Sequence, residues 1–218
     1  MHLRPRPLRH RVLTFAMIPV ACRMRPLLVC LLAVVSAFGQ QSDPQQLDES
    51  GQVTLDGHGV PYVVHRLPLN AFPDLPEKTL DQLNRRGCLI PQTYAAHHPE
   101  NVVHASLEAR GSSDWAVLCS AQGTVALLVF FESAPDKAIQ LASAPETRCL
   151  QRHDTTGVLG FNWAIDPASP AAVRQAQYGM DSRPPAIDHD ALADSIVDGR
   201  TVYRIYYQHA WMAIKPAQ

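Results

Sequence analysis

Three short apolar segments follow one another between residues 101 and 132, and the breaks between them have the composition of tight turns. The segments are "NVVHASLEA" at 101–109, "DWAVLCS" at 114–120 and "VALLVFFE" at 125–132. Runs of this length, separated by "RGSS" and "AQG", are typical of strands joined by hairpin turns. We therefore predict an antiparallel meander. The third segment is apolar almost throughout, which indicates a central strand covered on both faces.

Two short helices are predicted outside the meander. The first lies within "FPDLPEKTLDQLNRRGC" at 72–88, with Asp74 near its start, Pro76 in its first turn and Gly87 as its C-terminal cap. The second covers residues 169–179, with Ser169 as N-cap and Pro170 at the first helical position. The chain has eighteen prolines, which favour short elements joined by rigid turns.

Further strands are expected on both sides of the meander. Residues 60–69 are β-prone, but their prolines confine them to an edge strand or an extended segment. Residues 138–144 are predicted to form a strand or a short helix. Residues 157–165 are predicted to form a strand pair or an irregular strand. Residues 200–214 predict an aromatic hairpin that turns near 208–210. The expected fold is α+β, mainly antiparallel β-sheet (meander plus C-terminal hairpin) with two or three short helices.

The N-terminal residues 1–39 are predicted to be a signal peptide rather than part of the fold. The segment "MRPLLVCLLAVVSAFG", which begins at Met24, has a basic start, a short apolar run and small residues before the expected cleavage site. Met24 is an alternative start of the chain. The apolar run is too short for a membrane span. Residues 40–58 are predicted to be a flexible polar linker, and 59–218 a single globular domain.

Removal of the leader changes the charge of the chain. Six of the 19 basic residues and none of the 20 acidic residues lie in 1–39, so residues 40–218 carry a formal net charge of −7. An acidic domain without a lysine or arginine cluster is a poor ligand for nucleic acid or anionic lipid. Cationic partners or metal ions suit it better. We expect an exported protein, periplasmic or extracellular, that binds no nucleic acid.

Three cysteines remain after cleavage of the leader. Export to an oxidising compartment favours one disulfide. Cys88 follows a helix end and Cys119 ends an apolar strand, so both are expected to be buried, and we favour the pair Cys88–Cys119. Cys149 would be the leftover thiol. The alternative, a thiol nucleophile with a histidine partner, has no local sequence signature in its support.

The acidic segment "IDHDALAD" at 187–194 admits two interpretations. The first interpretation is a metal-binding loop. Its carboxylates, from Asp188, Asp190 and Asp194, would surround a hard cation, and calcium is the cofactor that such a loop would hold. However, alanine stands where a sharp calcium turn needs glycine. The other interpretation is an aspartate-rich N-cap for a short helix over 191–197, and we favour it.

Other chemistry-bearing residues have weaker signals. His97, His98 and His104 lie close in sequence, but no zinc motif accompanies them. Three acidic residues on or near neighbouring strands are the candidates for paired carboxylates: Glu108, Asp114 and Glu132. Solvated surface charges explain them equally well. No nucleophile elbow, phosphate-binding loop or dinucleotide fingerprint occurs in the sequence.

The segment 101–132 resembles a degenerate FG-GAP/VCBS unit, in which a strand, an acidic turn, an aspartate and two apolar strands follow one another. The order of "RGCLIPQ" at 86–92, the "DWAVLCS" strand, an Asp-His-Asp turn and an aromatic hairpin also resembles a group of uncharacterised secreted bacterial proteins. This resemblance covers about residues 70–214 and implies a shared fold without an activity. The alternating aspartates of an FG-GAP calcium loop are absent, and Asp114 is expected to cap the turn instead. The positions where such a calcium loop would need ligands are occupied by Ser106, Glu108 and Arg110.

Two functional classes remain open. The first is an exported non-catalytic binding domain that recognises a protein or envelope component through an open sheet face. Its anchors would be the hairpin aromatics Tyr203, Tyr206, Tyr207 and Trp211. The second is a metal-dependent hydrolase that uses the acidic loop at 188–194. A concave pocket where the loop meets histidine or glutamate would favour the enzyme, and we favour the binding domain.

Overall fold

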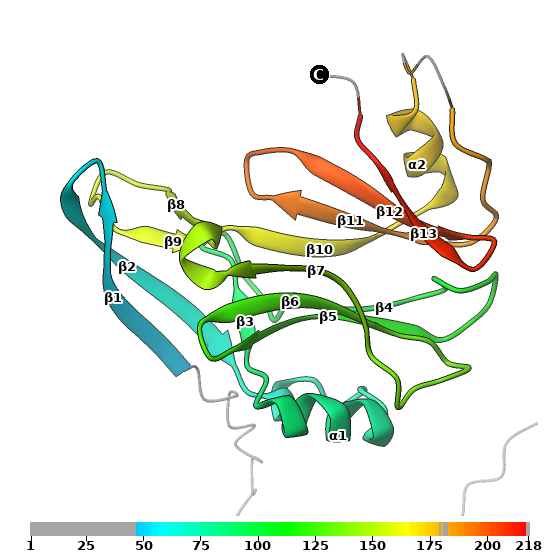
Figure 1. Ribbon diagram of the computed structural model, residues 1–218, viewed down its shortest axis with the longest axis horizontal. Helices are drawn as coiled ribbons and strands as arrows, with labels where there is room; N and C mark the ends of the chain where they lie inside the picture. Colours follow the sequence, from blue (N-terminus) through cyan, green and yellow to red (C-terminus); the bar gives the residue numbers. More distant parts are fainter. Residues whose placement is uncertain (1–46, 179, 181–182, 217–218) are drawn as a thin grey trace, which may run out of the picture. The chain divides into compact units, whose positions relative to one another are not determined.

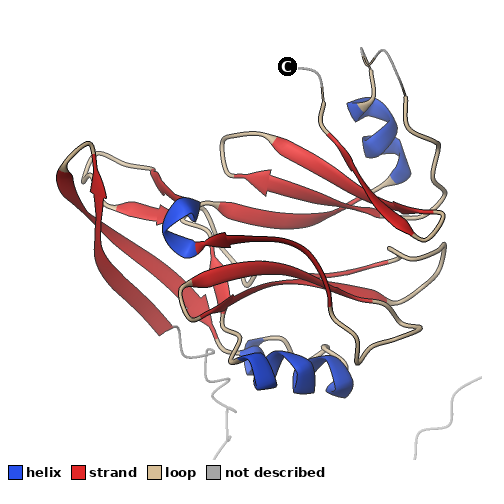
Figure 2. Cartoon of the chain, viewed as in Figure 1, coloured by secondary structure: helices blue, strands red, loops and turns tan. Residues whose placement is uncertain are grey.

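Strands form most of the regular structure in the computed structural model, which describes residues 47–178, 180 and 183–216 (Figure 2). The strands are arranged in three mainly antiparallel sheets with two short α-helices. The predicted α+β fold that is mainly β is therefore confirmed. The signal peptide expected over 1–39 lies outside the described residues. No helix in the described ranges has both the length and the apolar character needed to cross a membrane.

The meander forms the sheet that we call the central sheet. Its strands are β4 (Val102–Ala105), β5 (Asp114–Ala121), β6 (Thr124–Phe130) and β7 (Ile139–Pro145), in that order. The meander prediction is confirmed, and β6 is an inner strand between β5 and β7, as expected. The β5–β6 hairpin turns at Gln122 and Gly123, which both have positive φ. Such a turn matches the right-handed twist of the strands that it joins.

The last strands form a second antiparallel sheet, called the C-terminal sheet. They are β10 (Trp163–Ala168), β11 (Ala191–Ile196), β12 (Thr201–Tyr207) and β13 (Ala210–Ile214). The predicted hairpin is confirmed, with its turn at Gln208 and His209. The helix expected over 191–197 is wrong. Those residues form β11, because Ala191 and Leu192 are buried in a strand that pairs with both β10 and β12.

The remaining strands form the N-terminal sheet. They are β1 (Leu47–Leu55), β2 (His58–Leu67), β3 (Ile90–Gln92), β8 (Leu150–Arg152) and β9 (Leu159–Phe161). Strand β1 corrects the linker predicted over 40–58, since residues 47–55 pair along their whole length with β2. Nor is β2 an edge strand, because β3 and β9 pair with its other side. Pro61 is tolerated because those two strands pair only from Tyr62 onwards.

Both helices begin and end close to where the sequence predicted. Helix α1 (Glu77–Arg86) ends at Gly87, whose left-handed φ of 68° provides the cap. Helix α2 (Pro170–Ala176) begins after Ser169, whose side chain accepts a hydrogen bond from the Ala172 N–H. Two 3₁₀ turns complete the elements, η1 (Leu69–Ala71) and η2 (Glu146–Cys149).

Three clusters of buried side chains join these elements in layers. The largest lies between the central and the C-terminal sheet, and it also takes Val64 and Phe161 from the N-terminal sheet. The second joins the other face of the central sheet to α1 through Leu83, and the third joins the C-terminal sheet to α2 through Val173. The layers therefore run from α1 through the central sheet and the C-terminal sheet to α2 (Figure 1).

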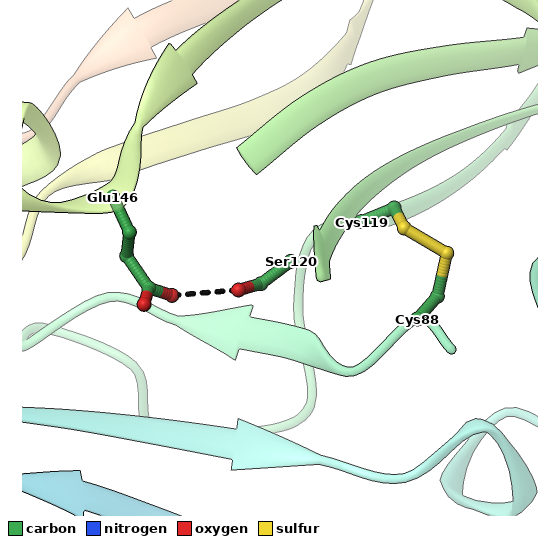
Figure 3. Close-up of a disulfide and its surroundings, with 4 residues drawn as sticks. All are labelled: Cys88, Cys119, Ser120 and Glu146. Carbon is green, nitrogen blue, oxygen red and sulfur yellow. Dashed lines mark hydrogen bonds between the residues drawn. A yellow bond between two sulfur atoms is a disulfide. The ribbon is translucent and has the colours of Figure 1, made fainter. Parts of the chain in front are cut away.

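The predicted disulfide between Cys88 and Cys119 is present, with Cα atoms 5.0 Å apart (Figure 3). It connects the residue after the α1 cap to strand β5, within the buried cluster beneath the helix. Cys149 is free and buried. The disulfide therefore fixes α1 to the central sheet at the point where the helix ends.

Candidate binding groove beside α1

The four hairpin aromatics do not form one exposed face. Tyr206 and Trp211 are cross-strand partners on the inner face of the C-terminal sheet, and both pack against Phe131 of the largest cluster. Tyr203 and Tyr207 lie on the opposite face, packed against the cluster beneath α2. All four hairpin aromatics are half-buried. Side chains alternate between the two faces of a strand, so residues 203 and 207 cannot share a face with residue 206.

The three aspartates of the acidic loop are likewise separated. Asp190 accepts a hydrogen bond from the Ser106 N–H, and Asp188 is exposed. The Asp194 carboxylate accepts hydrogen bonds at 2.6 Å from the Trp163 indole N–H and the Arg204 guanidinium. Arg204 thus already compensates the charge of Asp194. No group of three acidic, histidine or cysteine residues within the described ranges is placed to hold a metal ion.

Asp114 organises the turn between β4 and β5, as the sequence predicted. Its fully buried carboxylate accepts hydrogen bonds from the N–H groups of Leu107 (2.7 Å), Glu108 (2.6 Å) and Glu132 (2.8 Å), and from the Ser112 hydroxyl. Four donors leave this carboxylate little capacity to bind a further cation. Its role is therefore to hold the turn together through these four hydrogen bonds.

A groove of about 570 Å³ opens between the segment before α1 and the first strands of the central sheet. One wall is the segment 71–76, which begins with the last residue of η1. The other wall takes Val102 and His104 from β4 and Trp115 from β5. Buried Leu75 anchors the first wall to the cluster beneath the helix, and prolines within the segment restrict its backbone. The groove is thus built from rigid parts on both sides.

The His104 ring forms the rim of this groove. It stacks on the indole of its cross-strand partner Trp115, with ring centroids 4.4 Å apart and planes 10° apart. Its Nε2 lies 2.7 Å from the Ser113 hydroxyl oxygen. Trp115 itself is buried, so His104 presents the exposed end of an aromatic pair to the groove. Asp74 adds an acidic group on the facing wall.

The contact between Ser113 and His104 has the distance of a nucleophile and its base, but it lacks the third member of a triad. Within the described residues no carboxylate hydrogen-bonds the other nitrogen of His104. The candidate carboxylates serve the turn instead: Glu132 accepts the Ser113 N–H and Glu108 accepts the Ser133 hydroxyl. A histidine that no acid orients is a poor general base. The Ser113–His104 contact is therefore incomplete as a catalytic triad.

A buried ion pair away from the groove links the N-terminal sheet to the central sheet. Arg66 of β2 donates to both oxygens of Glu146, and the Ser120 hydroxyl donates to Glu146 at 2.8 Å (Figure 3). Burial alone lowers the pKa of Arg66, but its hydrogen bonds and charge contacts with Glu146 and Glu49 outweigh that effect and raise it. The pair is fully satisfied and serves structure rather than chemistry.

Sequence reasoning missed the groove because its walls are distant in the chain. Phe72 and Trp115 are about forty residues apart, and no spacing rule links a segment before a helix to the second strand of a meander. His104 was singled out only for its neighbours His97 and His98, which do not line the groove. Comparisons with family models, curated proteins and solved structures found no match to this chain, so the FG-GAP resemblance stays a prediction.

Proposed function

We propose that this chain is an exported, non-catalytic binding domain whose groove beside α1 takes an extended segment of a partner protein or envelope component. The observation that carries the proposal is the groove itself, with Phe72 on one wall and Val102 and the His104–Trp115 stack on the other. Aromatic and proline-rich walls bind extended segments with little loss of conformational entropy, because the walls are already ordered.

Export is supported by two features. The leader predicted over 1–39 has the composition of a signal peptide, and the Cys88–Cys119 disulfide is compatible with an oxidising compartment. A periplasmic or extracellular protein meets other exported proteins and envelope components. We infer that the partner belongs to one of these two classes.

The chemistry of the groove limits which segment fits. Phe72, Val102 and Trp115 suit an apolar or aromatic side chain of the partner. Asp74 on the rim, together with the net charge of −7 on residues 40–218, favours a lysine or arginine beside that side chain. The proposed ligand is therefore an extended segment with one apolar anchor and an adjacent basic residue.

Site-specific photo-cross-linking tests this proposal. The full chain carries p-benzoylphenylalanine in place of Phe72, or in place of Tyr178, which is 65% exposed at the end of α2 and serves as the matched control. Irradiation in the exporting cell should give discrete cross-linked products from position 72 and not from position 178. The cross-linked segment, read by mass spectrometry, should contain an apolar residue next to a lysine or arginine.

Two further variants separate this function from its competitors. Asp74→Lys should reduce the cross-linking yield by about tenfold if a basic residue of the partner lies on the rim. Equal products from positions 72 and 178 would contradict the proposal. Ester hydrolysis by the purified protein that disappears in Ser113→Ala would instead show that the Ser113–His104 pair is catalytic.

A further inference from the structure

Strand β1 has an outer edge that lacks the usual protection of edge strands. It is nine residues long, pairs with β2 without a register shift, and contains no proline, lysine or arginine. Other edge strands in the described ranges are interrupted or short: β4 has four residues, β8 three and β13 five, β7 carries a register shift, and β10 contains Pro167. No described strand pairs with the outer edge of β1 (Figure 1). An unprotected edge of this length is a template for another strand.

The charges on β1 do not oppose such pairing. Asp48 is hydrogen-bonded at 2.8 Å to the His65 ring, and Glu49 forms an ion pair with Arg66, both within the β1–β2 hairpin. Both carboxylates therefore already have hydrogen-bond partners inside the hairpin. The two ends of the strand are apolar and exposed, since Leu47 is 39% and Leu55 45% accessible. They are two of the few large apolar side chains left exposed in the described part of the chain.

The sequence of β1 is complementary to itself in one antiparallel register. If a two-fold axis passes through Gly51, Leu47 of one copy lies opposite Leu55 of the other, and Glu49 lies opposite Val53. No two like charges are then directly opposite, and the exposed leucines cover each other. Glycine at position 51 is already required within the hairpin, because a Cβ there would meet the Tyr62 oxygen at 2.7 Å, and it places no side chain at the axis.

Backbone hydrogen bonding permits the same register. The turn at Asp56 and Gly57 makes Leu55 and His58 the closing pair of the hairpin, so the odd-numbered residues of β1 bond to β2. The N–H and C=O groups of the even-numbered residues 48–54 therefore point outward. A two-fold axis at residue 51 brings even residues opposite even residues and allows about eight hydrogen bonds between the copies. The leucines then occupy non-hydrogen-bonded pairs, where side chains lie closest.

We propose that two copies of this chain form a symmetric dimer by antiparallel pairing of their β1 strands around Gly51. The two N-terminal sheets become one continuous sheet. The groove beside α1 is not part of the edge that pairs in this dimer. The interface is isologous, so it closes after two copies and forms no fibre. A single strand pair with two leucine contacts is a small interface, and we expect a dissociation constant in the micromolar range. The inference does not depend on the function proposed for the groove.

Sedimentation equilibrium of the exported, leader-free protein tests the dimer. Gln52→Pro removes an outward N–H at the centre of the edge and leaves the bonds to β2 intact, so the dissociation constant should rise at least about tenfold. Leu55→Lys, which places a charge opposite Leu47, should have the same effect. Met212→Lys is the matched control, because Met212 is 37% exposed on the short edge strand β13, and it should leave the dimer unchanged.

Cross-linking tests the register independently of stability. Ser50 and Gln52 lie opposite each other across the proposed axis, so a mixture of the Ser50→Cys and Gln52→Cys variants should form a heterodimeric disulfide on mild oxidation. The native Cys149 is buried and should not compete. A wild-type protein that remains monomeric at about 100 μM would overturn the proposal. It would also be overturned by a dimer that Gln52→Pro leaves intact and that the cysteine mixture fails to cross-link.

Discussion

Two hairpins of this molecule have nearly the same turn and very different surroundings. The β5–β6 hairpin turns at Gln122–Gly123 and the β1–β2 hairpin at Asp56–Gly57, all four residues with positive φ. Yet seven of the eight residues of β5 are buried, whereas β1 is exposed except for two half-buried positions. Turn chemistry therefore makes both hairpins, but only the first is covered on both faces, by α1 and by the C-terminal sheet.

This difference separates the roles of the two regions. The central sheet holds Cys119 of the disulfide, the fully buried Phe130 and one wall of the groove. The β1–β2 hairpin depends on ion pairs and on Val64 and the half-buried Tyr62, which reach the largest cluster. We expect the central sheet to set the global free energy of unfolding and the outer part of the hairpin to open on its own.

The largest expected effect comes from removing a core aromatic side chain. Phe130 of β6 is 1% exposed in the cluster beneath α1, so Phe130→Ala should lower the free energy of unfolding by about 3–5 kcal/mol. Val60→Ala in the half-buried outer part of β2 should cost at most about 1 kcal/mol. Urea unfolding followed by circular dichroism measures both, and similar losses would remove the distinction between the two regions.

The success of the sequence predictions follows the same division. The meander, both helices, the C-terminal hairpin and the disulfide were predicted because each leaves a local signal in apolar periodicity, caps or turns. Strand β1 was missed because a strand exposed on both faces has no apolar alternation. The Asp56–Gly57 pair after "QVTL" was the one signal that could have revealed it.

Long-range pairing explains the other errors. Strand β11 was taken for a capped helix because aspartates precede it, whereas its two neighbouring strands determine its conformation. The parallel contact of β2 with β9 rests on two residue pairs separated by about one hundred positions in the chain. No local pattern encodes such contacts, and the groove is built from contacts of the same kind.

The second prediction uses one arginine that spans both regions. Arg66 pairs with Glu146, which is 5% exposed beside the central sheet, and with Glu49, which is 46% exposed on β1. Glu146→Ala leaves a buried guanidinium and the Ser120 hydroxyl without their acceptor, and should cost about 3 kcal/mol. Glu49→Ala removes an exposed partner of the same group and should cost less than about 1 kcal/mol.

If urea unfolding at neutral pH shows the same loss of unfolding free energy for Glu146→Ala and Glu49→Ala, the buried and the exposed partner of Arg66 contribute equally and this prediction is wrong. Glu146→Gln provides the control for packing, because it keeps the volume and a hydrogen-bond acceptor while it removes the charge. Its loss should lie between those of the two alanine variants.

The third prediction concerns pH and the buried thiol. Burial, followed by the nearby charges of Glu146 and Asp194, raises the pKa of Cys149 from 9.0 to about 11. Because the folded protein disfavours the thiolate, its contribution to stability is complete below pH 9 and is lost as the pH rises towards 11. Thermal melting between these pH values should show a steeper decline for the wild type than for Cys149→Ala. Parallel curves would show that Cys149 ionises as readily in the folded state as in the unfolded one.

The smallest effect tests the comparison most directly, through two glycines with the same local geometry. Gly57 has φ 79° and Gly123 has φ 73°, and a Cβ at either position would meet no atom within 4 Å. Alanine at each therefore costs the same conformational strain, about 1 kcal/mol. What differs is the unit of structure that the strain destabilises.

In the Gln52→Pro background, where no second copy covers β1, Gly57→Ala should accelerate hydrogen exchange of the β1 and outer β2 amides about fivefold. It should leave the global free energy of unfolding unchanged. Gly123→Ala should lower the global value by about 1 kcal/mol and speed exchange throughout the central sheet, because β5 and β6 open only when the whole domain unfolds. If both variants lower the global value equally, the β1–β2 hairpin belongs to the same cooperative unit as the central sheet, and its exposure does not make it independent.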